Sequence, residues 1–300
     1  MGIGSGYLQT LANLKNKGYL ENGSRVIEIG AQQLHNSFLR EVGKVNDLGA
    51  LFGVKTPFKR LEPTASSIAH GELEALGSDA PFARDFYTWL GFEYAAVDID
   101  GSPNSLPLDL NYDSAPWDAI GKYNLVTNFG TTEHVANQIN AFKLIHELAA
   151  PNGIMVHELP AQGYLNHGLV NYNPKFFWML ARSNGYELIH MDFNWSGVDY
   201  LLPQNILDYI SQFVDTNNRP PYKTADAGIL VIIRKVFDTP FVAPLDVPTG
   251  TKAPNKALEE RYWSVFDQNA FRSRTAQKGG TSRAKAFIMA VINRILTVSK

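Results

Sequence analysis

The stretch RVIEIGAQQLHN, residues 25–36, decides how the rest of the sequence is interpreted. Its first five residues are mostly apolar and β-branched, which predicts a short buried strand that carries one acid, Glu28. Gly30 follows at once, and a glycine there lets the backbone approach a ligand closely, because a side chain would occupy the ligand's space. A helix is expected next, over about 32–42. The stretch therefore predicts the first strand, turn and helix of an α/β fold.

Strand and helix patterns alternate along the chain as far as residue 237. Alternation of this kind predicts a mostly parallel, doubly wound sheet with helices on both faces. Only ten residues, two of them prolines, separate Asp98 from Asp109, so the strand between them must be short or reached by a loop. The further strands are expected at 94–99, 106–110, 123–128, 154–158, 186–191 and 228–237, and the further helices at 7–17, 82–90, 131–150 and 174–184.

One α/β domain with insertions and extensions is the expected organisation. The segment 43–81 interrupts the first strand–helix–strand unit, and we interpret it as a lid or substrate wall, with a neutral surface loop as the alternative. The last thirty residues carry seven Lys or Arg and no acid, with an apolar stripe typical of an amphipathic helix. Such a helix can lie on an anionic membrane, dock on a partner, or pack on its own domain or a second copy. The predicted divisions are an N-terminal helix segment 1–24, a domain 25–237 with insertions at 43–81 and 194–227, a linker 238–270 and the basic helix 271–300.

Composition excludes several classes of protein. The formal net charge of −2 and a pI near 6.4 argue against a general nucleic-acid binder, which usually has a basic bias. The absence of cysteine excludes disulfides, thiolate catalysis and cysteine-based metal sites. No apolar run reaches the roughly 18 to 20 residues that span a bilayer, and the first residues do not resemble a signal peptide. A soluble cytoplasmic protein is the default expectation.

Polar residues gather where the expected strands end, which is where open α/β sheets bind ligands. Asp98 ends the second strand, and one carboxylate there can accept both hydroxyl hydrogens of a ribose. Asp109, within PLDLN, can accept from an adenine amino group. Asn128 ends the strand that leads into the sequence TTEHV.

The order of EIGAQ, VDID, LDLN, NLVTNFGTTEHV and APNGIMVHELP resembles that of the class I S-adenosylmethionine-dependent methyltransferases, over about 25–191. The resemblance implies a Rossmann-like fold and S-adenosylmethionine as cofactor. Ala31, Gln32 and Gln33 stand where the family usually has further glycines, so Gln32 is expected to point its side chain away from the methionine moiety. The cofactor contacts that the resemblance implies are Glu28, Gly30, Ala31, Asp98, Ile99, Asp109, Leu110, Asn128, Phe129 and Gly130.

The reaction that the resemblance implies is an in-line displacement, in which a nucleophile attacks the methyl carbon of a sulfonium. The protein then has to align the partners and accept a proton if the nucleophile is a hydroxyl. The candidate proton acceptors are His134, which is expected to open the helix after the strand at 123–128, His157, which is expected at the pocket rim at the end of the strand at 154–158, and His167. For His134 the alternative is a local structural role, and for Glu133 it is an interaction with a helix dipole. The expected substrate contacts are Glu133, Glu158, Tyr164 and His167, in a stretch whose aromatic residues could equally be loop packing.

Together these patterns predict methyl transfer to a small polar acceptor, with an oxygen of a sugar or natural-product-like molecule as the target. The alternative is a non-catalytic methyltransferase-fold module that binds a partner through its insertions and basic tail. A nicotinamide dehydrogenase fits less well, because the expected G-x-G-x-x-G is missing. The metalloprotease pattern H-E-x-x-H and the nucleophile turn G-x-S-x-G are missing as well.

Overall fold

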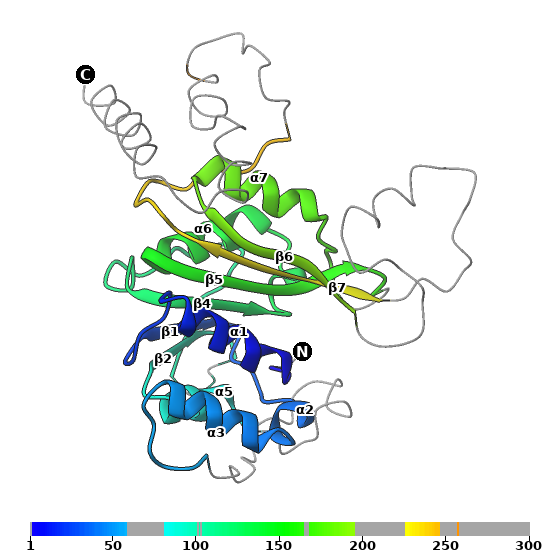
Figure 1. Cartoon of the computed structure of the whole chain (residues 1–300). Helices are drawn as coiled ribbons and strands as arrows, with labels where there is room; N and C mark the ends of the chain where they lie inside the picture. The colour runs from blue at the N-terminus through cyan, green and yellow to red at the C-terminus, as the bar shows by residue number, and fades with distance from the viewer. Residues whose placement is uncertain are drawn as a thin grey trace, which may run out of the picture.

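A computed structural model describes residues 2–58, 81–100, 102, 104–164, 168–195, 226–246 and 257 (Figure 1). The predicted basic helix at 271–300 lies outside the described residues, as do most of the two predicted insertions and of the linker. The first insertion begins as an ordinary part of the fold, because its described part includes helix α3, Val42–Leu51, which packs its buried Val45 and Leu48 into the core.

A seven-stranded sheet in the order β3-β2-β1-β4-β5-β7-β6 forms the centre of the described residues. The pairs from β3 through β5 are parallel, and β7 runs antiparallel to both β5 and β6. The prediction of a mostly parallel sheet is therefore confirmed. The strands are β1 Arg25–Ile29, β2 Glu93–Val97, β3 Ser105–Leu106, β4 Tyr123–Phe129, β5 Ala149–Gln162, β6 Glu187–Trp195 and β7 Ala227–Arg234.

Helices cover both faces of the sheet (Figure 1). Successive strand residues point to opposite faces, so neighbouring residues of β1 enter different cores. Val26 packs with α1, α3 and α5, and Ile27 with α6 and α7. Asn173 caps α7 by accepting the Lys175 N–H, and Gly185, at a φ of 67°, ends it as predicted. Besides α3, the described helices are α1 Gly6–Asn16, α2 Asn36–Leu39, α5 Ala83–Trp89, α6 Gln138–Leu148 and α7 Pro174–Asn184.

The predicted position of the helix after β1, 32–42, is wrong, because the first helix there is α2 at Asn36–Leu39. Residues 31–35 instead form a non-helical segment, because the backbone of Gln33 and Leu34 pairs with two other segments. Leu34 N donates to Pro81 O at 2.8 Å, and Ile3 N donates to Gln33 O at 2.8 Å. The His35 side chain then accepts the Ser37 N–H and caps the short helix α2. The stretch therefore lies between the N-terminal residues and the start of α5 and forms backbone hydrogen bonds with both.

The prediction of one continuous helix over 131–150 is also wrong. A 3₁₀ turn, η1 Thr132–His134, comes first, and α6 begins only at Gln138, where the Asn137 side chain caps it by accepting the Asn140 N–H. Ile139, in the first turn of α6, is 44% exposed. The break separates the residues that follow β4 from the helix that supports them.

Candidate functional site

Three strand ends meet at one edge of the sheet, as the sequence predicted. Ile29 of β1 is in register with Val97 of β2 and with Asn128 of β4. The next residues of each strand therefore lie side by side. In the sheet, β2 lies on one side of β1 and β4 on the other. The connection after β1 leads to β2, away from β4, so the chain connections diverge between β1 and β4. Ligands of open α/β sheets bind at such a point.

The turn after β1 is held by the end of β2. Gly30, at a φ of 80°, donates its N–H to Val97 O at 2.8 Å, and Ala31 N donates to Asp98 Oδ2 at 2.8 Å. Burial raises the pKa of Asp98 above its usual value. A Cβ at Gly30 would collide with the hydroxyl of Thr131. The expectation that a side chain at Gly30 would occupy ligand space is therefore corrected, because Thr131 already occupies that position.

Glu28 lies under this turn and is fully buried. Its Oε2 accepts the Gln32 N–H at 3.0 Å and the Tyr94 hydroxyl at 2.8 Å, while its Oε1 has no hydrogen-bond partner among the described residues. Burial is the largest effect on the carboxyl group and raises its pKa to about 8. Glu28 thus holds the backbone of the turn and keeps one oxygen unpaired in the interior.

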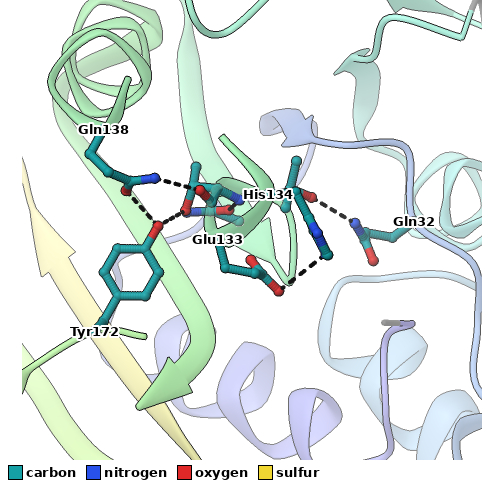
Figure 2. Close-up of polar contacts among 8 residues, drawn as sticks. Gln32, Glu133, His134, Gln138 and Tyr172 are labelled. Carbon is teal, nitrogen blue, oxygen red and sulfur yellow. Dashed lines mark hydrogen bonds and ion pairs between the residues drawn. The ribbon is translucent and has the colours of Figure 1, made fainter. Parts of the chain in front are cut away.

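The side chain of Gln32 does not point away from the strand ends. Its Nε2 donates to Gly30 O at 3.2 Å and to Thr131 Oγ1 at 3.3 Å, so the amide bridges the turns after β1 and β4. Figure 2 shows the Gln32 nitrogen directed at the turn that carries Glu133 and His134, and its oxygen directed away from that contact. Oε1 is buried, and in the described part of the chain it has no hydrogen-bond partner. This bridge was not expected from the sequence.

A buried polar network holds η1 in place (Figure 2). Thr132 N donates to Asn128 Oδ1 at 3.3 Å, and Asn128 Nδ2 donates back to Thr132 Oγ1 at 2.9 Å. The Tyr172 hydroxyl lies 2.8 Å from the same Thr132 oxygen and donates to Gln138 Oε1 at 2.6 Å. Gln138 Nε2 then donates to the carbonyl oxygens of Thr132 and Val135. The backbone groups that η1 leaves unpaired are therefore satisfied by side chains.

His157 belongs to the same network and does not lie at a rim. It is 1% exposed, in the middle of β5, with its ring near those of Phe142 and Phe177. Asn128 Nδ2 contacts His157 Nδ1 at 3.2 Å, and because that amide nitrogen only donates, Nδ1 accepts and the proton is on Nε2. Nε2 has no hydrogen-bond partner, and burial lowers the pKa of His157 to about 3. The expected position at the pocket rim is therefore corrected, and the geometry gives His157 a structural role.

Glu133 and His134 sit together on η1. His134 Nε2 lies 3.8 Å from Glu133 Oε1, with the His134 side chain 46% exposed and that of Glu133 fully buried. The Glu133 carbonyl accepts the N–H groups of Leu169 and Val170, at 2.8 and 3.1 Å, so that segment covers the acid. His134 ends a 3₁₀ turn and does not open a helix, so the helix-dipole alternative for Glu133 has no helix to act on.

The comparisons with known proteins agree with this geometry. A family described as "Methyltransferase domain" matches residues 7–193, more than half of the chain. The chain belongs to this family. The predicted family is confirmed, and with it methyl transfer as the class of activity and S-adenosylmethionine as the methyl donor.

Solved structures resemble the methyltransferase only distantly. One is the [4+2]-cyclase SpnF, at 13% identity and a TM-score of 0.38, with 77% of this chain and 80% of that chain covered. Another is a SAM-dependent methyltransferase from Archaeoglobus fulgidus, at 12% identity and a TM-score of 0.36, with 76% and 93% covered. A third is the 1,6-didemethyltoxoflavin-N1-methyltransferase of Burkholderia thailandensis, at 9% identity and a TM-score of 0.39, with 77% and 78% covered. No curated protein matches the chain.

The residues at the strand ends fit S-adenosylmethionine, whose methionine end carries an ammonium beside the sulfonium. A buried acceptor without a hydrogen-bond partner among the described residues, Gln32 Oε1, belongs to the turn after β1 and is of the kind that a cationic group needs. Ile99, an expected cofactor contact directly after Asp98, is 76% exposed. Leu110, also an expected cofactor contact, is buried in the core.

Other expected cofactor contacts have partners within the protein. Asp109 Oδ1 accepts from Asn111 N at 2.8 Å and closes a local turn. Phe129 is buried on the opposite face of β4 from Asn128, with its ring 4.9 Å from that of Tyr7, so its side chain is corrected to a core position. Gly130, at a φ of 67°, donates its N–H to Glu158 O at 3.0 Å. The contacts of these residues with the cofactor remain predictions.

The expected substrate side lies at the far end of β5. Glu158 accepts a hydrogen bond from the Asn194 amide of β6, and burial raises the pKa of the acid. Tyr164, at a φ of 47°, donates its N–H to Asp226 Oδ1 at 2.7 Å. His167 lies outside the described residues. Tyr172, from the stretch expected to meet substrate, is buried in the network under η1.

The described residues place no group of three or more His, Asp or Glu side chains where they could hold a metal ion. Within the same part of the chain, no helix combines the length and apolarity needed to cross a membrane. The roles of Thr131, Thr132 and Gln138 were not expected from the sequence. Thr131 contacts Gln32, and both Thr132 and Gln138 contact Tyr172, and these partners lie tens of residues away, so no local pattern indicates the contacts.

Proposed function

We propose that this methyltransferase transfers the methyl group to an oxygen of a small polar molecule, with sugars and natural-product-like hydroxyl compounds as the acceptor class. The observation that carries the proposal is the pair formed by half-exposed His134 and buried Glu133, directly after β4. A hydroxyl that attacks a methyl carbon has to lose its proton, and a histidine is suited to accept it near neutral pH.

The Glu133 carboxylate supports this role because a negative charge beside the imidazole stabilises the cation that forms when the proton arrives. The network of Asn128, Thr132, Tyr172 and Gln138 supports it as well, because it restrains the turn on which both residues sit. Hydrogen-bonding groups for a hydroxyl-rich acceptor are present at Glu158 of β5 and Asn194 of β6, which bond each other across β7. Catalysis then consists mainly of alignment and of one proton transfer.

The test is a methyl-transfer screen with radiolabelled S-adenosylmethionine over sugars, phenols and amines, followed by kinetics of His134→Ala on the best acceptor. We expect transfer to a hydroxyl compound and a loss of turnover of about 100-fold or more in the variant, in line with general base catalysis. The affinity for S-adenosylhomocysteine should stay within about twofold. The control is His190→Ala, which removes an exposed histidine of β6.

The possible results separate the alternatives. Equal turnover in His134→Ala would return His134 to a structural role. Transfer to amines alone would overturn the choice of oxygen. Intact binding of S-adenosylhomocysteine without transfer to any acceptor, including those in extracts of the native cells, would favour the non-catalytic binding module.

A further inference from the structure

The amide of Gln32 is the one feature of the first turn that departs from its family and also has an unpaired buried atom. The residue is 6% exposed. Its backbone is held at both ends, because Gln32 N donates to Glu28 Oε2 at 3.0 Å and Gln32 O accepts the Ala83 N–H at 2.8 Å. These two bonds fix the backbone of Gln32 between β1 and α5, and so fix where its side chain begins.

The orientation of this amide follows from its partners. The Gly30 carbonyl can only accept, and it lies 3.2 Å from the outer atom of the Gln32 amide that is assigned as Nε2. Exchanging the amide nitrogen and oxygen would place two acceptors against each other. Oε1 must therefore be the atom on the other side, where no group of the described residues donates to it. A buried amide oxygen without a donor costs free energy, and native proteins seldom leave one unpaired.

The position of the unpaired oxygen suggests what pairs with it. Gln32 bridges the ends of β1 and β4, where the chain connections diverge and a ligand of this fold lies. Asp98, the predicted ribose contact, ends β2 on the other side of β1. A cofactor with its ribose at Asp98 then has its amino-acid end toward β1 and β4. The donor group at that end is the α-ammonium.

We propose that Gln32 Oε1 accepts a hydrogen bond from the α-ammonium of S-adenosylmethionine, which makes Gln32 a side-chain ligand at a position where the family usually has glycine. The Nε2 contacts with Gly30 and Thr131 hold the amide in place before the cofactor binds, so little ordering is needed at that moment. This inference concerns cofactor binding, so it does not depend on which acceptor is methylated.

The experiment compares two ligands by calorimetry without a methyl acceptor. One ligand is S-adenosylhomocysteine, and the other is its analogue with hydrogen in place of the α-amino group. For Gln32→Leu we expect a loss of about 10- to 100-fold in affinity for S-adenosylhomocysteine, the range typical of a hydrogen bond to a charged group. The affinity for the deamino analogue should change by less than about threefold. Gln9→Leu, at an exposed glutamine of α1, is the matched control.

Three outcomes would overturn the proposal. An equal loss for both ligands would mean that Gln32 only shapes the turn. Unchanged affinity for S-adenosylhomocysteine would mean that the oxygen has no part in binding, and tighter binding would mean that the amide obstructs the cofactor. If Gln32→Leu folds poorly, as judged by circular dichroism, Gln32→Glu takes its place. Its carboxylate keeps an acceptor, so its preference for S-adenosylhomocysteine over the analogue should equal or exceed that of the wild type, and a lost preference would contradict the proposal.

Discussion

The carboxylate of Asp98, at the end of β2, accepts the backbone N–H of Ala31 at 2.8 Å and so closes the turn that follows β1. Its other oxygen accepts the Asp100 N–H at 3.3 Å. One acid thus joins two of the three strand ends at the site. A hydroxyl group that binds Asp98 would meet a carboxylate whose position is already fixed by the backbone.

Asp98→Asn should weaken binding of S-adenosylhomocysteine by about tenfold or more, because an amide offers one acceptor where a carboxylate offers two. The melting temperature should change little, because the amide oxygen can still accept the Ala31 N–H. Calorimetry and thermal unfolding measure the two effects, with exposed Asp118→Asn as the control. Unchanged affinity would remove Asp98 from the predicted cofactor contacts.

Tyr172→Phe removes the hydroxyl that joins Thr132 to Gln138 while it keeps the buried ring. We expect a loss of about 1–2 kcal/mol in the free energy of unfolding, the usual cost of a broken buried hydrogen bond. Turnover should fall by about tenfold with unchanged affinity for S-adenosylhomocysteine, because η1 carries His134 but not the turn after β1. Urea unfolding and steady-state kinetics measure these changes. Tyr112→Phe, at a residue that is 84% exposed, is the control. A loss of stability with full turnover would mean that the network does not serve catalysis.

Glu28 should make the fold less stable as the pH rises. Its pKa is about 8 in the fold against an ordinary value of 4.5, so between these values the folded chain keeps a proton that the unfolded chain releases. The free energy of unfolding should therefore fall from about pH 4.5 to about pH 8 and then level off. Glu28→Gln cannot ionise, and relative to it the wild type should lose on the order of a few kcal/mol across this window. Urea unfolding at several pH values tests this, and parallel profiles for the two proteins would contradict it.

His157 should have the opposite effect, at acid pH. Burial lowers its pKa to about 3 from an ordinary 6.5, so as the pH falls between these values the unfolded chain gains a proton that the folded chain does not. Stability is therefore lost on acidification through this window. His157→Asn retains an acceptor for Asn128 and should lose less stability between pH 6.5 and pH 4 in urea unfolding. Its turnover at neutral pH should match the wild type, and a large loss of turnover in a folded variant would restore His157 as a catalytic candidate. His146, whose pKa is lowered to about 4, is present in both proteins and does not affect the comparison.

The sheet could be predicted because each strand is a continuous local signal. The apolar run that ends at Gly30, the acid at the end of β2 and the Asn173–Pro174 start of α7 each act within a few residues. The helix boundaries after β1 and β4 could not be predicted in the same way. After β1, the distant residues Ile3 and Pro81 take backbone hydrogen bonds that a longer helix would have used. After β4, the Gln138 side chain takes two of them.

The sequence by itself determined the fold class, the family and the strand ends at which the site lies, because these depend on local hydrophobic patterns and on the order of short motifs. Only the tertiary structure decided what the individual polar side chains do. It buried His157, paired Glu133 with His134, and turned Gln32 across the strand ends with one oxygen unpaired. The physical reason is that burial and hydrogen-bond partners are set by residues tens of positions away, and these alone decide which polar atoms remain for a ligand.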